Sequence, residues 1–155
     1  MTNFKSLTIW TIVLSFFILV GAGHGLICVG LLDVFWIVAT LTGRHISQDF
    51  ASFSLTGSYE QSLGAAALLS FLGQVILLIS FTIKEPGKIR IKLLGLSLLW
   101  VGYYYLIHNC LKDSASQLSL FSGIPFLISS GLLTYRMIKE KLSSIRSQSV
   151  IEKRL

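Results

Sequence analysis

The sequence KEPGKIRIK (residues 84–92) separates two long apolar runs of the chain. It contains four basic residues and the pair Pro86-Gly87, and proline followed by glycine predicts a turn. Short loops rich in lysine and arginine stay on the cytoplasmic side of a membrane. We therefore expect two membrane-crossing helices that are joined here by a cytoplasmic turn.

The other basic residues repeat this asymmetry. Of the 13 lysine and arginine residues, all but two lie at Lys5, in the 84–92 stretch, or in the tail from Arg136 to Arg154. If the chain crosses a bilayer four times, these residues share one side, and only Arg44 and Lys112 lie on the other. The distribution predicts a membrane protein with both termini in the cytoplasm.

The composition also indicates a membrane protein. The 155 residues are 53% hydrophobic and 13% charged, and the mean hydropathy is +0.74, which is too apolar for a soluble domain of this size. The net charge of +6 follows the loops and the tail, so we expect no nucleic-acid partner. The expected partners are membrane lipid, especially anionic headgroups, and another membrane protein or a second copy of the chain. A bacterial inner membrane or a plasma membrane is favoured, and the same charge rule also holds in organelle membranes.

Four apolar runs are long enough to cross a bilayer, which takes roughly 20 helical residues. The expected helices are 7–31 with an extension to 42, 62–83, 91–111 and 118–137. The first run could also turn at Gly23-His24-Gly25, but a fifth crossing would scatter the basic residues over both sides. The sequence thus predicts an all-α, integral membrane four-helix bundle in one domain (1–155). Pro125 is expected to kink the fourth helix, and residues 138–155 to form a basic helical tail.

Small residues on each predicted helix suggest how the helices pack, because helices in lipid associate through close contact. Each helix has one face of small or hydrogen-bonding side chains. The candidate packing residues are Gly21 and Gly25, Ser70 and Gly73, Gly95 and Gly102, and Gly123 on the fourth helix.

Two histidines and two cysteines fall near the predicted outer ends of the first and third helices. His24 and Cys28 lie one helical turn apart and share a face, and His108 and Cys110 lie at a similar depth. Imidazoles and thiolates bind transition metals, and two histidines can ligate haem iron. However, about 100° per residue puts Cys110 roughly 200° from His108, which argues against one compact site.

Three interpretations of these side chains stay open. His24 can bond to a neighbouring helix while His108 lies at the wet interface, and this interpretation implies no cofactor. A haem or transition-metal site is the alternative. In an oxidising compartment, Cys28 and Cys110 could also pair as a disulfide.

Asp33 is the only acid within the apolar runs. At the centre of a bilayer it would cost about 2.5 to 3.5 kcal/mol, but a straight first helix places it near the outer surface, where this cost largely disappears. His24 lies nine residues earlier, on the opposite face of such a helix. Asp33 is therefore a candidate ion or proton site without His24 as its partner.

The sequence has no signature of a nucleophilic enzyme. GxSxG, HExxH and phosphate-binding glycine loops are missing from it. We expect a small polytopic membrane protein that is a non-enzymatic accessory, assembly or lipid- or protein-binding component. The alternative is a metal- or haem-binding protein of redox or transport function that uses the four outer histidines and cysteines.

Overall fold

The structure is a computed structural model that describes residues 4–22, 25–42, 59–83 and 87–152. This part of the chain is mostly helical, as predicted. Its elements are α1 (Phe4–Phe16), β1 (Leu19–Ala22), β2 (Gly25–Cys28), α2 (Val29–Leu41), α3 (Tyr59–Ile79), α4 (Gly87–Ile107), α5 (Ser114–Ser122) and α6 (Ile124–Glu152). Helix α3 is long and apolar enough to cross a membrane between Ser62 and Ile79. The bent pair α5–α6 is a second such span if the two helices are counted as one.

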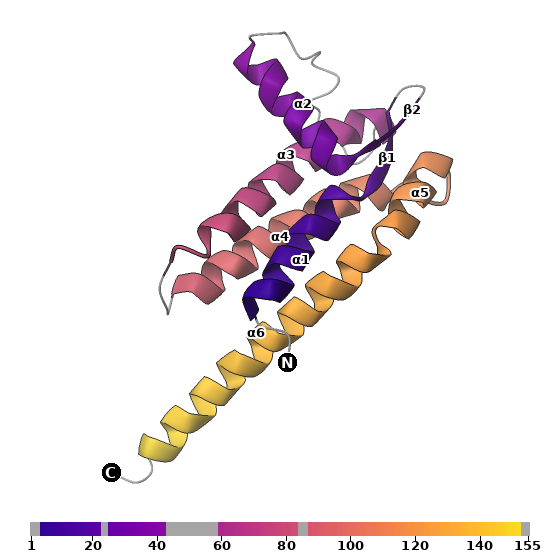
Figure 1. Ribbon diagram of the computed structural model, residues 1–155. Helices are drawn as coiled ribbons and strands as arrows, with labels where there is room; N and C mark the ends of the chain where they lie inside the picture. The colour runs from indigo at the N-terminus through magenta and orange to yellow at the C-terminus, as the bar shows by residue number, and fades with distance from the viewer. Residues whose placement is uncertain (1–3, 23–24, 43–58, 84–86, 153–155) are drawn as a thin grey trace.

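The helices are arranged around an antiparallel pair, α3 and α4, which makes the most extensive contact in the molecule (Figure 1). Helix α1 packs mainly on α6, and α2 packs on α3. In Figure 1, the start of α1, the end of α3 and the far half of α6 point toward one end of the molecule. The hairpin, α2 and α5 lie toward the other end.

The first apolar run differs from the predicted helix 7–31. Helix α1 ends at Phe16, and β1 and β2 then form an antiparallel hairpin in which Leu19 pairs with Cys28 and Ala22 with Gly25. Each glycine of the GAGHG segment (residues 21–25) weakens a helix by about 1 kcal/mol relative to alanine, and the flanking β-branched residues favour strands. The predicted helix-packing role of Gly21 and Gly25 is therefore wrong, since both lie in strands.

Helix α5 bonds to the free edge of this hairpin at Leu19. The Leu19 N–H donates to Ser122 Oγ at 2.9 Å, and Ser119 Oγ donates to the Leu19 carbonyl at 2.8 Å. On the other side, the Val29 N–H donates to the Ile18 carbonyl at 2.9 Å and extends the ladder into the start of α2. Polar backbone in an apolar setting needs such partners, so these bonds explain how a short hairpin is tolerated.

Glycines bring α3 and α4 into close contact. A Cβ added at Gly73 would lie 2.8 Å from the Gly95 carbonyl oxygen, and one at Gly95 would lie 2.9 Å from the Gly73 carbonyl oxygen. A Cβ at Gly102 would lie 2.8 Å from Ser70 Oγ. Backbone therefore packs directly on backbone here, as in membrane helix pairs with small residues at the interface.

The fourth helix, predicted over 118–137, begins earlier, at Ser114, and is bent by 48° between α5 and α6. Gly123 lies at the break, and Pro125 has no N–H to offer the Phe121 carbonyl. Tyr103 packs on Gly123, and its hydroxyl donates to the Leu120 carbonyl at 3.0 Å. Beyond the bend, α6 continues to Glu152 through most of the expected tail.

The interior combines an apolar core with many buried polar side chains, and many large apolar side chains lie on the exterior. Buried polar side chains occur on every helix and in the turn after α3: Thr8, Thr11, Ser15, Asp33, Ser62, Ser70, Gln74, Ser80, Lys92, Ser116, Ser119, Ser129 and Ser130. Large apolar side chains on the same helices face outward, including Trp10, Phe35, Leu78, Trp100, Phe121 and Ile128. So many exposed large apolar side chains are more typical of a surface that contacts an apolar phase than of a soluble domain.

Candidate functional site

The hairpin carries Asp33 into the protein interior. Because the Val29 N–H bonds to the Ile18 carbonyl, α2 starts at the level where α1 ends, and Asp33 follows one turn later. Its side chain is only 2% exposed. The expected straight helix through Asp33 is therefore wrong, because the chain folds back on itself at the hairpin and Asp33 lies inside the protein.

Asp33 meets two polar side chains from other helices. Gln74 of α3 lies beside it, and the Gln74 amide Nε2 donates to Ser15 Oγ of α1 at 3.2 Å. Ser15 in turn donates to the Ile12 carbonyl at 2.7 Å. Gln74 and Ser15 are each 2% exposed, so the three side chains form a buried cluster that we call the Asp33 cluster.

The Asp33 carboxyl group has no complete set of partners in the part of the chain that the structure describes. Neither of its oxygens makes a hydrogen bond of standard geometry there, although Gln74 is its neighbour. An amide can serve a carboxyl group in either state, because Gln74 Oε1 accepts from a protonated carboxyl and Nε2 donates to an ionised one. The cluster can therefore hold Asp33 with or without a proton.

More hydroxyl groups extend this polar interior along α1. Thr8, Thr11 and Ser15 lie on one helix face, and Thr8 and Thr11 donate to the carbonyls of Phe4 and Leu7. Thr11 Oγ1 also lies 2.9 Å from Ser129 Oγ of α6, so one hydroxyl pair joins these two helices. The inner face of α1 is thus polar from its first turns to the Asp33 cluster.

The candidate metal ligands are only partly described. His24 lies outside the described residues, and Cys28 and Cys110 are free thiols at the end of β2 and in the turn after α4. His108 Nδ1 lies 2.9 Å from the Tyr105 carbonyl oxygen, and its buried Nε2 has no hydrogen-bond partner among the described residues. Within those residues, no group of three or more His, Cys, Asp or Glu side chains could hold a metal ion.

Lys92 is a buried residue that the sequence pattern did not single out. The sequence predicts it at the boundary between the basic turn and the third helix, whereas α4 begins at Gly87, so Lys92 falls in the second turn and is 2% exposed. Its Nζ lies 4.8 Å from the centre of the Phe4 ring and 5.8 Å from that of Phe81. These cation–π contacts join the ends of α1, α3 and α4. The pairing depends on tertiary contact with α1, which the spacing of basic residues cannot indicate.

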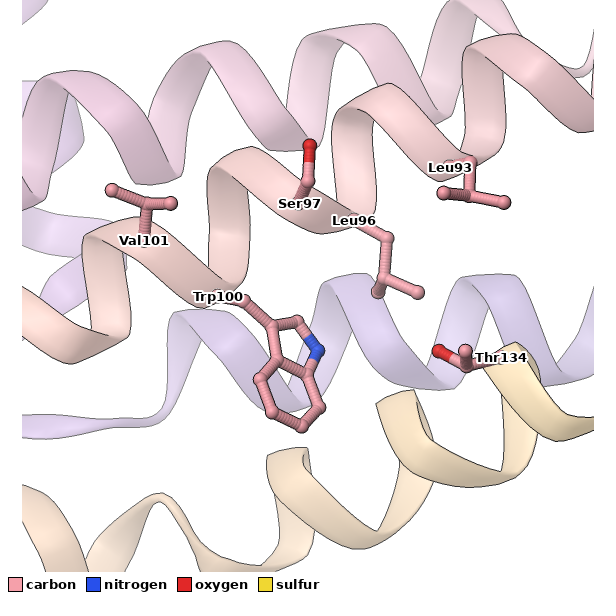
Figure 2. Close-up of a pocket in the computed structure, with 6 residues that line it drawn as sticks. All are labelled: Leu93, Leu96, Ser97, Trp100, Val101 and Thr134. Carbon is pink, nitrogen blue, oxygen red and sulfur yellow. The ribbon is translucent and has the colours of Figure 1, made fainter.

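An apolar groove of about 410 Å³ opens between α4 and α6. It is lined by Leu93, Leu96, Ser97, Trp100 and Val101 of α4 and by Thr134 of α6. In Figure 2, Leu96 and Trp100 point from α4 toward α6, and the α1 ribbon passes between these two helices. Phe4 and Leu7 of α1 pack in the neighbouring core, against Leu96 and residues of α6. The groove thus opens where α4 and α6 diverge.

Comparison with known proteins provides no further assignment. No protein-family model matches the chain, and neither a curated protein nor a solved structure matches it.

Proposed function

We propose that this chain is a small multi-pass membrane protein, without enzymatic activity, that binds a membrane phospholipid as an accessory component. The observation that carries the proposal is the large number of exposed apolar side chains, together with the acid, amide and hydroxyl groups that lie buried beside the apolar core. A bilayer is the solvent in which such an exterior is stable.

The proposed topology has four crossings. Helix α1 with β1 makes the first, α3 and α4 make the second and third, and the bent pair α5–α6 makes the fourth. The basic residues that precede, separate and follow these segments support a cytoplasmic location for both termini. The arrangement of the helix ends in Figure 1 supports this topology.

The groove between α4 and α6 is the proposed lipid site. Its lining is apolar and suits an acyl chain. Arg90 lies one helical turn before Leu93 on the same face of α4, and its side chain is exposed. A guanidinium at one end of an apolar groove fits an anionic phospholipid, because it can bond to the phosphate while the chain lies along Leu93 and Trp100.

Tryptophan fluorescence tests this proposal, because brominated acyl chains quench only the indoles that they touch. A Trp10→Phe/Trp36→Phe variant leaves Trp100 in the groove, and a matched Trp36→Phe/Trp100→Phe variant leaves Trp10 on the exposed face of α1. Both are reconstituted in phosphatidylcholine vesicles with increasing fractions of brominated phosphatidylglycerol.

Trp100 is expected to be quenched at lower fractions of the anionic lipid than Trp10, because a bound lipid is enriched at its site. Replacing Arg90 by Gln in the Trp100-only variant is expected to remove this difference. Equal quenching of the two indoles at every lipid fraction would contradict a lipid site in the groove.

A further inference from the structure

The Asp33 cluster has no part in the proposed lipid site and calls for a separate explanation. We propose that the Asp33 cluster is an internal proton-binding site, in which the Asp33 carboxyl group takes up and releases a proton beside Gln74 and Ser15. The inference does not depend on whether the groove binds lipid, because it rests on a different set of residues.

The position of Asp33 supports a proton as the ligand. The carboxyl group is 2% exposed, lies against Gln74 within the apolar span of α3, and has no hydrogen bond of standard geometry among the described residues. A structural acid would be expected to make a full set of bonds, since an unsatisfied buried polar group destabilises a fold. Asp33 instead lies beside the Gln74 amide, which can donate or accept, and its carboxyl oxygens can still form further hydrogen bonds.

The charges around Asp33 leave its ionised form without compensation. Helix α2 has no other charged residue, and it packs on α1, α3 and β2. Their titratable residues are Lys5, exposed in the first turn of α1, Tyr59 and Glu60, whose side chains lie outside the description, and Cys28, the last residue of β2. No basic side chain of the described residues therefore stands beside Asp33 to hold it permanently as a carboxylate.

Gln74 allows the cluster to accept both states. When a proton from water bonds to a carboxylate oxygen, the new O–H can donate to Gln74 Oε1. When the proton returns to water, the carboxylate can accept the second N–H of Nε2, while the first remains on Ser15. The bond between Gln74 and Ser15 is therefore compatible with uptake and release of the proton.

Labelling with dicyclohexylcarbodiimide tests the site, because this apolar reagent reacts with protonated carboxyl groups in apolar surroundings. The full chain in detergent is labelled over a range of pH, and the modified residues are located by peptide mass spectrometry. Asp113, which accepts a bond from the Ala115 N–H at the start of α5, is the internal reference. Labelling at Asp33 is expected to exceed that at Asp113 and to fall about tenfold per pH unit once the carboxyl is mostly ionised.

Infrared difference spectroscopy provides a second measurement that does not depend on access of the reagent. Raising the pH is expected to remove a protonated-carboxyl C=O band from the wild type, and the Asp33→Asn variant is expected to lack this change. Circular dichroism of that variant checks that it retains its helices.

Three results would overturn the proposal. The first is that folded protein shows neither Asp33 labelling nor the infrared change at any pH. The second is that Asp33 is labelled to the same extent at every pH. The third is that sodium protects Asp33 from labelling at fixed pH and ionic strength. The first two would mean that no proton exchanges at Asp33, and the third would mean that the cluster binds a metal cation.

Discussion

The Gln74 amide donates a hydrogen bond of 3.2 Å to the Ser15 hydroxyl and so joins two helices whose residues are 59 positions apart in the chain. The bond is buried, and it lies where α1 ends and α2 begins. Interhelical hydrogen bonds in membrane proteins contribute only about 0.6 kcal/mol on average. The more important consequence of this bond is positional, because it fixes the Gln74 amide beside Asp33.

Replacing Asp33 by Asn is expected to make the stability of the protein less dependent on pH. Asn has a similar shape and can bond to Gln74, but it cannot ionise. At high pH the wild type has to bury a carboxylate, so the variant is expected to be more stable there, by up to about 2.5 to 3.5 kcal/mol. At low pH, where Asp33 is protonated, the two proteins are expected to unfold at similar temperatures. Thermal unfolding followed by circular dichroism measures the difference, and a difference that is constant with pH would contradict the prediction.

Replacing Gly95 by Ala is expected to destabilise the contact between α3 and α4. The added methyl group would lie 2.9 Å from the Gly73 carbonyl oxygen, and backbone on both helices has to move to accommodate it. Overpacking of this kind costs about 1 to 3 kcal/mol, which exceeds the gain of up to about 1 kcal/mol from replacing glycine in a helix. Thermal unfolding in detergent is expected to show a lower midpoint than in the wild type.

Gly131 provides the matched control for this substitution. It lies in α6, and a Cβ added there would meet no atom within 4 Å. Gly131→Ala is therefore expected to leave stability unchanged or to raise it slightly. If both alanine variants changed stability equally, the close contact of Gly73 with Gly95 would not be the cause.

Replacing Tyr103 by Phe is expected to loosen the bend between α5 and α6. The substitution removes the donor to the Leu120 carbonyl and retains the ring that packs on Gly123. Loss of one such bond costs about 0.5 to 1.5 kcal/mol. Tyr104→Phe is the control, because Tyr104 is exposed and its substitution is expected to have no effect on unfolding. An unchanged midpoint for Tyr103→Phe would assign the bend to Gly123 and Pro125 alone.

The helical character of most of the chain could be predicted from the apolar runs and from the turn at Pro86-Gly87. The hairpin could not, because residues 7–42 are too few for two helices that each cross a bilayer, and a short apolar run does not by itself distinguish a strand from a helix. A strand rises about 3.3 Å per residue against about 1.5 Å in a helix, so a short strand covers the same distance as a longer helix. The strand is also held from a distance, since Ser119 bonds to Leu19 across 100 positions of the chain.

The place of Asp33 was missed for the same reason. In a straight helix, the position of a residue along the axis increases with its number. Here the hairpin returns the chain to the level of Ile18 before α2 begins. The proximity of Gln74 and Asp33 likewise depends on tertiary packing of α2 on α3. Both are polar residues within apolar runs, and this is the only signal that the local sequence pattern provides.

Cysteine labelling is expected to locate the two ends of the helix bundle on opposite sides of the membrane. In a Cys28→Ser/Cys110→Ser background, Gly87→Cys places a single thiol at the first residue of α4, and Leu111→Cys places one just after its end. Gly87 has room for a side chain, since a Cβ there would meet only Ile83 at 3.6 Å, and Leu111 is 93% exposed. With both termini in the cytoplasm, a membrane-impermeant maleimide added to intact cells is expected to label Leu111→Cys alone. Gly87→Cys is expected to react only after the membrane is permeabilised, because the basic residues around it hold that turn inside. Labelling of Gly87→Cys from outside, with protection of Leu111→Cys, would invert the topology, and labelling of both would rule out a membrane crossing by α4.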